Sequence, residues 1–200
     1  MALQYTHDPT TSTLSHPPAF DKPFVAHHKH FLGLVGSSPS LILIASTEPK
    51  HGGDGTALFH EAGVWVDTNE EVWFTSNLLR EPDRNEVGRI KVDGREGERD
   101  VGRSWTLLTE AERGAVVTGN GATLYNGEVL YCSQGAGTHT PSGLVAQNPE
   151  TLETKVLLNN FHGRPFNSIN DVVILPGADG ATSRTDLHAD MHTTIWFTDP

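Results

Sequence analysis

Two polar side chains stand directly ahead of a run of apolar residues near the end of the chain. Asn170 and Asp171 precede Val172-Val173-Ile174-Leu175, a run that predicts a buried strand. Amide and carboxylate oxygens at the mouth of a rigid strand are well placed to bind a ligand. Both residue types also favour turns, so a simple turn ahead of the strand is the alternative.

A second acidic side chain occupies a comparable place earlier in the chain. Glu61, in the segment H-E-A-G-V-W-V, lies just ahead of a short strand predicted over 64–66. Its carboxylate could bind a ligand there, or it could be a solvated loop acid. His27, His28 and His30 form a further polar cluster, for which the alternatives are adventitious metal binding and a solvated segment.

Composition excludes several classes of function. The 200 residues carry a formal net charge of −11, which argues against nucleic acid as a partner because phosphate binding needs clustered Lys and Arg. Cys132 is the single cysteine, so no intrachain disulfide can form, and its apolar neighbours predict a buried side chain. The sequence shows neither a signal peptide nor a membrane-spanning apolar run, and we expect a cytoplasmic protein without a membrane partner.

The elements that must position these residues are short strands. With 20 Gly and 12 Pro, the chain suits a turn-rich β protein, and no segment shows convincing helical periodicity. The Asn126-Gly127 pair is a strong hairpin signal. The predicted strands cover residues 41–45, 64–66, 72–75, 87–92, 105–108, 115–118, 123–125, 128–134, 144–146, 154–158, 172–175 and 195–198.

The chain contains an internal repeat. E-V-W-F-T-S-N starts at residue 71, E-V-L-Y-C-S-Q at 128 and T-I-W-F-T-D-P at 194, with an insert over 177–193 lengthening the last interval. Four short strands in a period of about sixty residues indicate β-propeller blades. We therefore predict an all-β fold in which residues 1–30 are a disordered arm and 31–200 a truncated propeller of about two and a half to three blades.

Several motifs resemble one known family. F-N-S-I-N-D-V-V-I with I-W-F-T-D-P, and H-E-A-G-V-W-V, resemble segments of the senescence-marker-protein/gluconolactonase/luciferin-regenerating-enzyme family. L-N-N-F-H-G-R-P-F-N and L-Y-C-S-Q-G are similar to its fungal lactonohydrolase branch. The resemblance covers about residues 31–200. The chain departs from the family pattern at Ile169, where Pro is usual, and in the long insert over 177–193.

The resemblance implies a six-bladed propeller that holds calcium, or another divalent cation, in its central channel. By position, Glu61 and Asn170 match two of the family's metal ligands, and the remaining ligands would lie beyond Pro200. Arg164, Asn167 and Asp199 lie near the same motif and would shape the substrate pocket.

The implied activity is metal-dependent hydrolysis of lactones such as aldonolactones, and we expect the truncation to impair it. Oxygen donors of this kind suit calcium, and a bound cation would polarise the lactone carbonyl. The alternative is a non-enzymatic propeller module that binds partners on its loop face, because a fold alone does not decide function.

Overall fold

A computed structural model describes residues 30, 33–34, 36, 43–78, 85–92, 105–137 and 139–174, and the backbone of 193–197. The chain divides into two compact units, Met1–Leu43 and Ile44–Pro200. The predicted arm over 1–30 lies outside the described residues except for His30, as does the insert over 177–193 except for Thr193. The second unit carries all the sheets described below.

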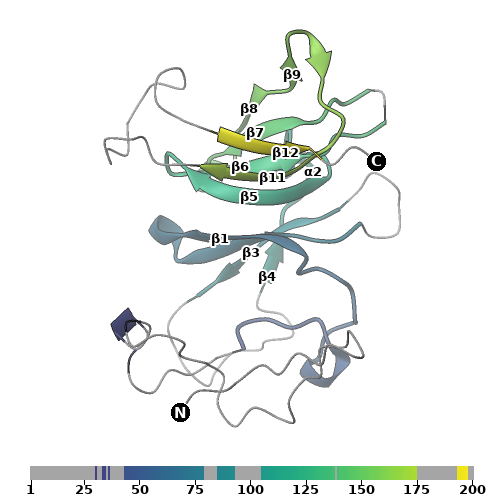
Figure 1. Ribbon diagram of the computed structural model, residues 1–200. Coiled ribbons are helices and arrows are strands. Elements are labelled where there is room, and N and C mark those ends of the chain that lie inside the picture. Colours follow the sequence, from purple (N-terminus) through teal and green to yellow (C-terminus); the bar gives the residue numbers. More distant parts are fainter. Residues whose placement is uncertain are drawn as a thin grey trace, which may run out of the picture. The chain divides into compact units, whose positions relative to one another are not determined.

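The second unit is built from antiparallel sheets, as predicted for an all-β protein (Figure 1). Two four-stranded sheets each run in sequence order, and two two-stranded sheets follow. The first sheet contains β1 (Glu61–Val66), β2 (Glu71–Thr75), β3 (Val87–Lys91) and β4 (Trp105–Leu107), and the second contains β5 (Gly119–Tyr125), β6 (Glu128–Ser133), β7 (Gly143–Gln147) and β8 (Thr154–Leu158). The small sheets pair β9 (Asn160–Phe161) with β10 (Arg164–Pro165), and β11 (Ile169–Ile174) with β12 (Thr193–Phe197).

Helix is confined to single turns in the described part of the second unit. They are η1 (Pro49–His51), η2 (Asp67–Asn69) and α2 (Glu110–Arg113). The α2 turn begins at Thr109, whose side chain accepts from the Glu112 backbone while the Glu112 carboxylate accepts from the Thr109 N–H, which is a capping box. Among the described helices, none has the length and apolar character needed to cross a membrane.

Local turn chemistry explains how the strands reverse. Asn126 and Gly127 both have positive φ, 52° and 79°, which is the conformation that a two-residue hairpin between β5 and β6 requires. Between β7 and β8, the Asn148 Oδ1 accepts from the backbone N–H groups of Glu150 and Thr151 at 2.8 and 2.9 Å. The Asn126-Gly127 hairpin was predicted from the sequence.

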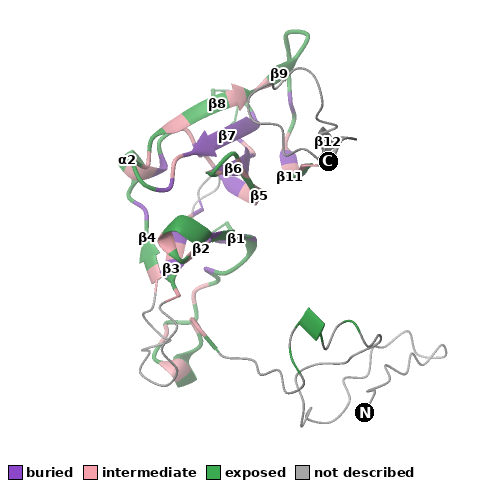
Figure 2. Cartoon of the chain, turned by 90° about the vertical axis from the view of Figure 1, so that its left-hand side faces the viewer, coloured by how far each residue is buried: buried purple, intermediate pink, exposed green. Residues whose placement is uncertain are grey.

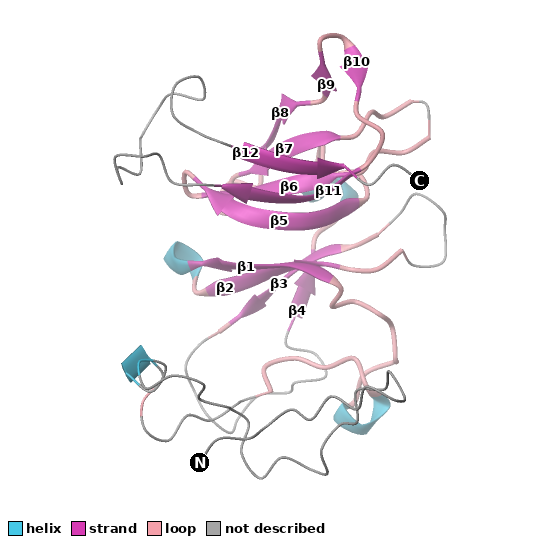
Figure 3. Ribbon diagram, viewed as in Figure 1, coloured by secondary structure: helices cyan, strands magenta, loops and turns pink. Residues whose placement is uncertain are grey.

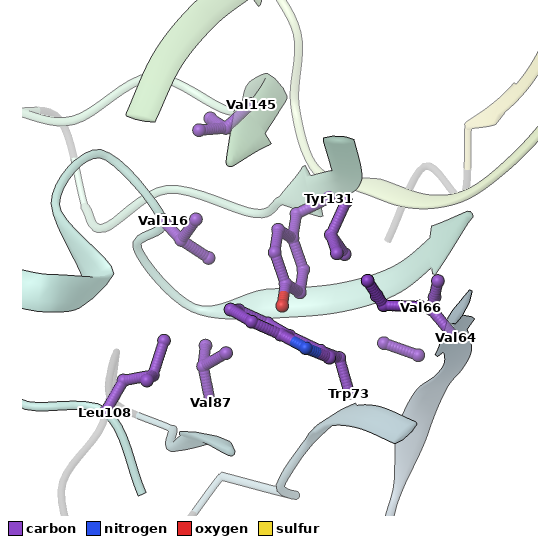
Figure 4. Packing of buried hydrophobic residues seen from close by; sticks show 10 residues of the cluster. Val64, Val66, Trp73, Val87, Leu108, Val116, Tyr131 and Val145 are labelled. Carbon is purple, nitrogen blue, oxygen red and sulfur yellow. The ribbon is translucent and has the colours of Figure 1, made fainter. Parts of the chain in front are cut away.

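A hydrophobic core lies between the first and second sheets. In β1 the buried and exposed residues alternate, so one face turns Val64 and Val66 towards the second sheet. Trp73 of β2 and Tyr131 of β6 are both fully buried here. Figure 4 shows the Tyr131 ring above the Trp73 ring, with smaller aliphatic side chains around them. This core is what joins the two four-stranded sheets.

The second sheet is covered on both faces. Val129 and Tyr131 of β6 face the first sheet, whereas Leu130 and Cys132 pack in a second cluster with residues of β11. Every residue of β7 is buried, and Figure 2 shows this strand buried along its length. Burial on both sides explains why β6 and β7 are continuous apolar runs in the sequence rather than alternating ones.

Two predicted strands are wrong where the structure describes them. Residues 43–45 form no strand, and Ile44 and Ala45 instead pack against a small cluster around Phe74. Residues 115–118 form the loop that enters β5, with Val116 contributing to the core between the sheets. In both segments the apolar residues pack into a core without forming the backbone hydrogen bonds of a sheet. Residue type alone therefore predicted a strand where there is none.

Candidate functional site

The first strands of three sheets lie side by side. We use "first strands" for β1, β5 and β11, and β5 contacts each of the other two. Figure 3 shows the three arrows pointing in the same direction. The residues that begin these strands are therefore gathered at one end of the sheets, which we call the site end.

Each first strand carries a β-bulge at the site end. In β1, Glu61 pairs with Thr75 and Val64 with Trp73, and the register shifts by one residue between them. The register shifts in the same way between Gly119 and Ala122 in β5, and between Ile169 and Asp171 in β11. Bulges bend a strand and re-aim its side chains, and they are common beside active sites. All three first strands therefore share a bulge that changes the direction of the side chains at the site end.

Glu61 is the first residue of β1, and its side chain is exposed. The next residue, Ala62, is buried with a φ of 57°, which places the backbone in the left-handed region. This conformation belongs to the bulge and turns Glu61 away from the core cluster that Ala62 enters. The carboxylate is accordingly available to solvent or to a ligand at the site end.

Asn170 lies within the bulge of β11 rather than in a turn ahead of the strand. Its side chain is half-buried, and its Oδ1 accepts a hydrogen bond from the Nδ2 of Asn120 in β5 at 3.1 Å. The neighbouring Asp171 is exposed, and its carboxylate accepts from the backbone N–H of Val172 at 2.8 Å. The turn alternative for Asn170-Asp171 is therefore wrong, because both residues belong to the strand.

Asn120 is the polar residue at this end that the sequence analysis missed. It follows the first residue of β5, as Asn170 follows the first residue of β11. The sequence signal was available, since Asn120-Gly121 and Asn170-Asp171 each begin a stretch of β-prone residues. It was overlooked because the strand was predicted to start only at Thr123, which left Asn120 outside it.

The Asp171 carboxylate influences the pKa of Cys132 in the second sheet. Burial and, to a smaller extent, the Asp171 carboxylate raise the pKa of the Cys132 thiol to about 12. A methyl group added at Gly121 would overlap this carboxylate, so β5 and β11 are in close contact at the bulge. The close approach is possible because Gly121 has no side chain.

Two of the three predicted substrate-binding residues, Arg164 and Asn167, fall within the described residues. Arg164 is exposed in β10, within the hairpin that β9 and β10 form, and Asn167 is exposed in the segment between β10 and β11. Asp199 lies outside the described residues. Substrate binding by these three residues stays a prediction.

The two predicted metal ligands share the site end but sit on strands that β5 separates. The structure joins Asn170 to Asn120 by a hydrogen bond, and it places Glu61 on the other side of β5. Within the described ranges, no three His, Cys, Asp or Glu side chains gather into a metal-binding group. The donors available here are the carboxylates of Glu61 and Asp171 and the side-chain oxygens of Asn120 and Asn170, a set that fits a hard cation such as calcium.

Comparisons of the chain with protein-family models, with curated proteins and with solved structures find no match.

Proposed function

We propose that this chain is a metal-dependent lactone hydrolase whose sheets are successive blades of a β-propeller. The observation that carries the proposal is the arrangement of the first strands. They lie side by side, run in one direction and each bear a bulge at the same end, as inner strands around a propeller channel would. Two of the sequence motifs that resemble the gluconolactonase family, H-E-A-G-V-W-V and F-N-S-I-N-D-V-V-I, span the bulges of β1 and β11.

The residues that would hold the cation are Glu61 and Asn170. The exposed Glu61 carboxylate offers charged oxygen, and Asn170 Oδ1 keeps one lone pair free while it accepts from Asn120. A bound calcium ion would act as a Lewis acid towards the lactone carbonyl. Asn120 keeps the Asn170 amide from rotating, so the acceptor oxygen holds a fixed direction. Arg164, Asn167 and Asp199 would bind the hydroxyl-rich substrate around this point.

The proposal is tested by calcium titration calorimetry and by turnover of an aldonolactone, both on the whole 200-residue chain. We expect weak calcium binding that is weaker still in Glu61→Gln and in Asn170→Ala, with lactone turnover lost in the same variants. Removing one ligand from an oxygen-donor site lowers the calcium affinity. The water molecule that takes its place carries no negative charge and is not held in a fixed position.

Glu150→Gln is the matched control for Glu61→Gln. Glu150 is an exposed acid in the turn between β7 and β8, at the opposite end of the second sheet from the bulges. This change removes the same charge from the surface and should leave calcium affinity and turnover unchanged. Full activity of Glu61→Gln or Asn170→Ala in the presence of a chelator would show that the metal-hydrolase proposal is wrong.

One observation favours the alternative of a partner-binding module. Phe161 in the β9–β10 hairpin is 68% exposed, and its ring contacts only the edge of the His162 ring among the described aromatic pairs. Exposed aromatic side chains are enriched at protein interfaces. This alternative predicts that Glu61→Gln has no effect on the protein's activity in cells whereas Phe161→Ala does.

A further inference from the structure

The side chain of Asn120 contains an oxygen that the fold leaves without a partner. Its Nδ2 donates to Asn170 Oδ1, and its backbone oxygen accepts from the Thr75 hydroxyl at 3.0 Å. Its Oδ1 is buried and makes no hydrogen bond. Buried amide oxygens are almost always paired, so one that is not needs an explanation such as an ion that is bound in the working protein.

The position of Asn120 is fixed from both sides. Thr75 belongs to the first sheet and Asn170 to the sheet of β11, so hydrogen bonds from two neighbouring sheets hold this one residue. Asn120 therefore stands between the strand that begins with Glu61 and the strand that contains Asn170. A residue whose backbone is held by Thr75 and whose side chain is held by Asn170 loses little further freedom on binding a ligand, which favours tight coordination.

We infer that Asn120 is a further ligand of the cation site and that its Oδ1 is the oxygen supplied by the second sheet. The inference rests on the proposed function, since it takes the site end to be a cation site. Calcium accepts amide oxygens alongside carboxylates, and Asn120 Oδ1 and Asn170 Oδ1 belong to amides already joined by a hydrogen bond. The donor set then comprises Glu61, Asn120 and Asn170, one from each first strand.

The experiment is calcium titration calorimetry on the whole chain, combined with the change in Tm on adding calcium. Asn120→Ala should weaken calcium binding about tenfold or more, the range that loss of a metal-site residue typically gives. Asn120→Asp keeps the size and the Oδ1 but replaces the Nδ2 donor to Asn170 with a second oxygen. The added negative charge should outweigh this lost hydrogen bond, because calcium affinity rises with the number of charged ligands. Asn120→Asp should bind calcium more tightly than the wild type and show a larger calcium-dependent rise in Tm, because binding to the folded state stabilises it.

Asn69→Ala serves as the matched control. Asn69 is also half-buried, and its Nδ2 donates across the two sheets to the Pro149 oxygen at 3.2 Å, at the opposite end from the bulges. Its loss should lower Tm without changing calcium affinity. If Asn120→Ala behaves in the same way, Asn120 is only a structural residue and the inference is overturned.

The remaining outcomes separate the inference from the proposed function. Calcium binding that Glu61→Gln weakens but that Asn120→Ala and Asn120→Asp leave unchanged overturns the assignment of Asn120 alone. A wild-type chain that binds no calcium overturns the proposed function, and the assignment of Asn120 with it. If Asn120→Ala does not fold, Asn120→Asp decides: tighter binding supports the inference, and unchanged or weaker binding overturns it.

Discussion

Among the single side chains, Cys132 shows most directly how burial controls chemistry. Burial and, to a smaller extent, the Asp171 charge raise the pKa of its thiol from the ordinary 9.0 to about 12. At pH 8 the native thiolate fraction should thus be on the order of a thousandfold below that of the unfolded chain. We expect very slow reaction with a disulfide reagent such as DTNB in the native protein and rapid reaction in denaturant, measured by the release of thionitrobenzoate.

The same pKa shift determines how Cys132 contributes to stability. A raised pKa means that the folded state disfavours the thiolate, so the contribution is complete below the unfolded pKa of about 9 and is lost as pH rises towards about 12. In Cys132→Ala, the free energy of unfolding should therefore fall less between pH 8 and 11 than it does in the wild type. Denaturant melts over this pH range would measure the difference. Native DTNB reaction as fast as in the unfolded chain would contradict the burial of the thiol.

Among the elements, β5 packs against both β1 and β11. Gly121→Ala would place a methyl group against the Asp171 carboxylate and 2.9 Å from the Asn170 backbone oxygen. Backbone atoms cannot move aside cheaply, so we expect a loss of about 1–3 kcal/mol in the free energy of unfolding. Chemical denaturation followed by far-UV circular dichroism measures the change.

The bulge of β1 provides the comparison for this substitution. Gly63 occupies the corresponding place, and a Cβ built there meets no atom within 4 Å. Gly63→Ala should therefore be close to neutral, or slightly stabilising because alanine restricts the unfolded chain. Equal losses in the two variants would mean that glycine is needed for bulge conformation in general, and that contact between β5 and β11 is not the reason.

Most strands were predictable from sequence because their residues both favour the β conformation and fit the burial pattern of the sheets. Residues 154–158 were predicted with the bounds that the structure gives, and the Asn126-Gly127 hairpin followed from turn chemistry alone. The bulge of β1 was not predictable from hydrophobic alternation, because buried and exposed residues alternate without interruption through it. Glu61 and Asn170 could therefore be chosen by their place ahead of apolar residues, whereas the hydrogen bond between Asn120 and Asn170 depends on the packing of β5 against β11.

At the level of the whole chain, the outer strand of the second sheet determines how copies should interact. Among the described strands β8 pairs only with β7, and its Val156 and Leu158 are 50% and 40% exposed. An outer strand with apolar side chains and unpaired backbone groups promotes association between copies. We expect the 200-residue chain to be poorly soluble and to self-associate as its concentration rises, as sedimentation velocity would measure.

Val156→Lys should reduce this association. A charged side chain on an outer strand opposes pairing with another copy, and substitutions at exposed positions usually change the free energy of unfolding by less than about 0.5 kcal/mol. Val145→Lys, on the adjacent strand, is the comparison: Val145 pairs with Val156 but is buried in the core between the sheets, so a lysine there should prevent folding. A wild-type chain that sediments as a monomer at all concentrations, or a Val156→Lys variant that associates as strongly as the wild type, would show that β8 is not the associating edge.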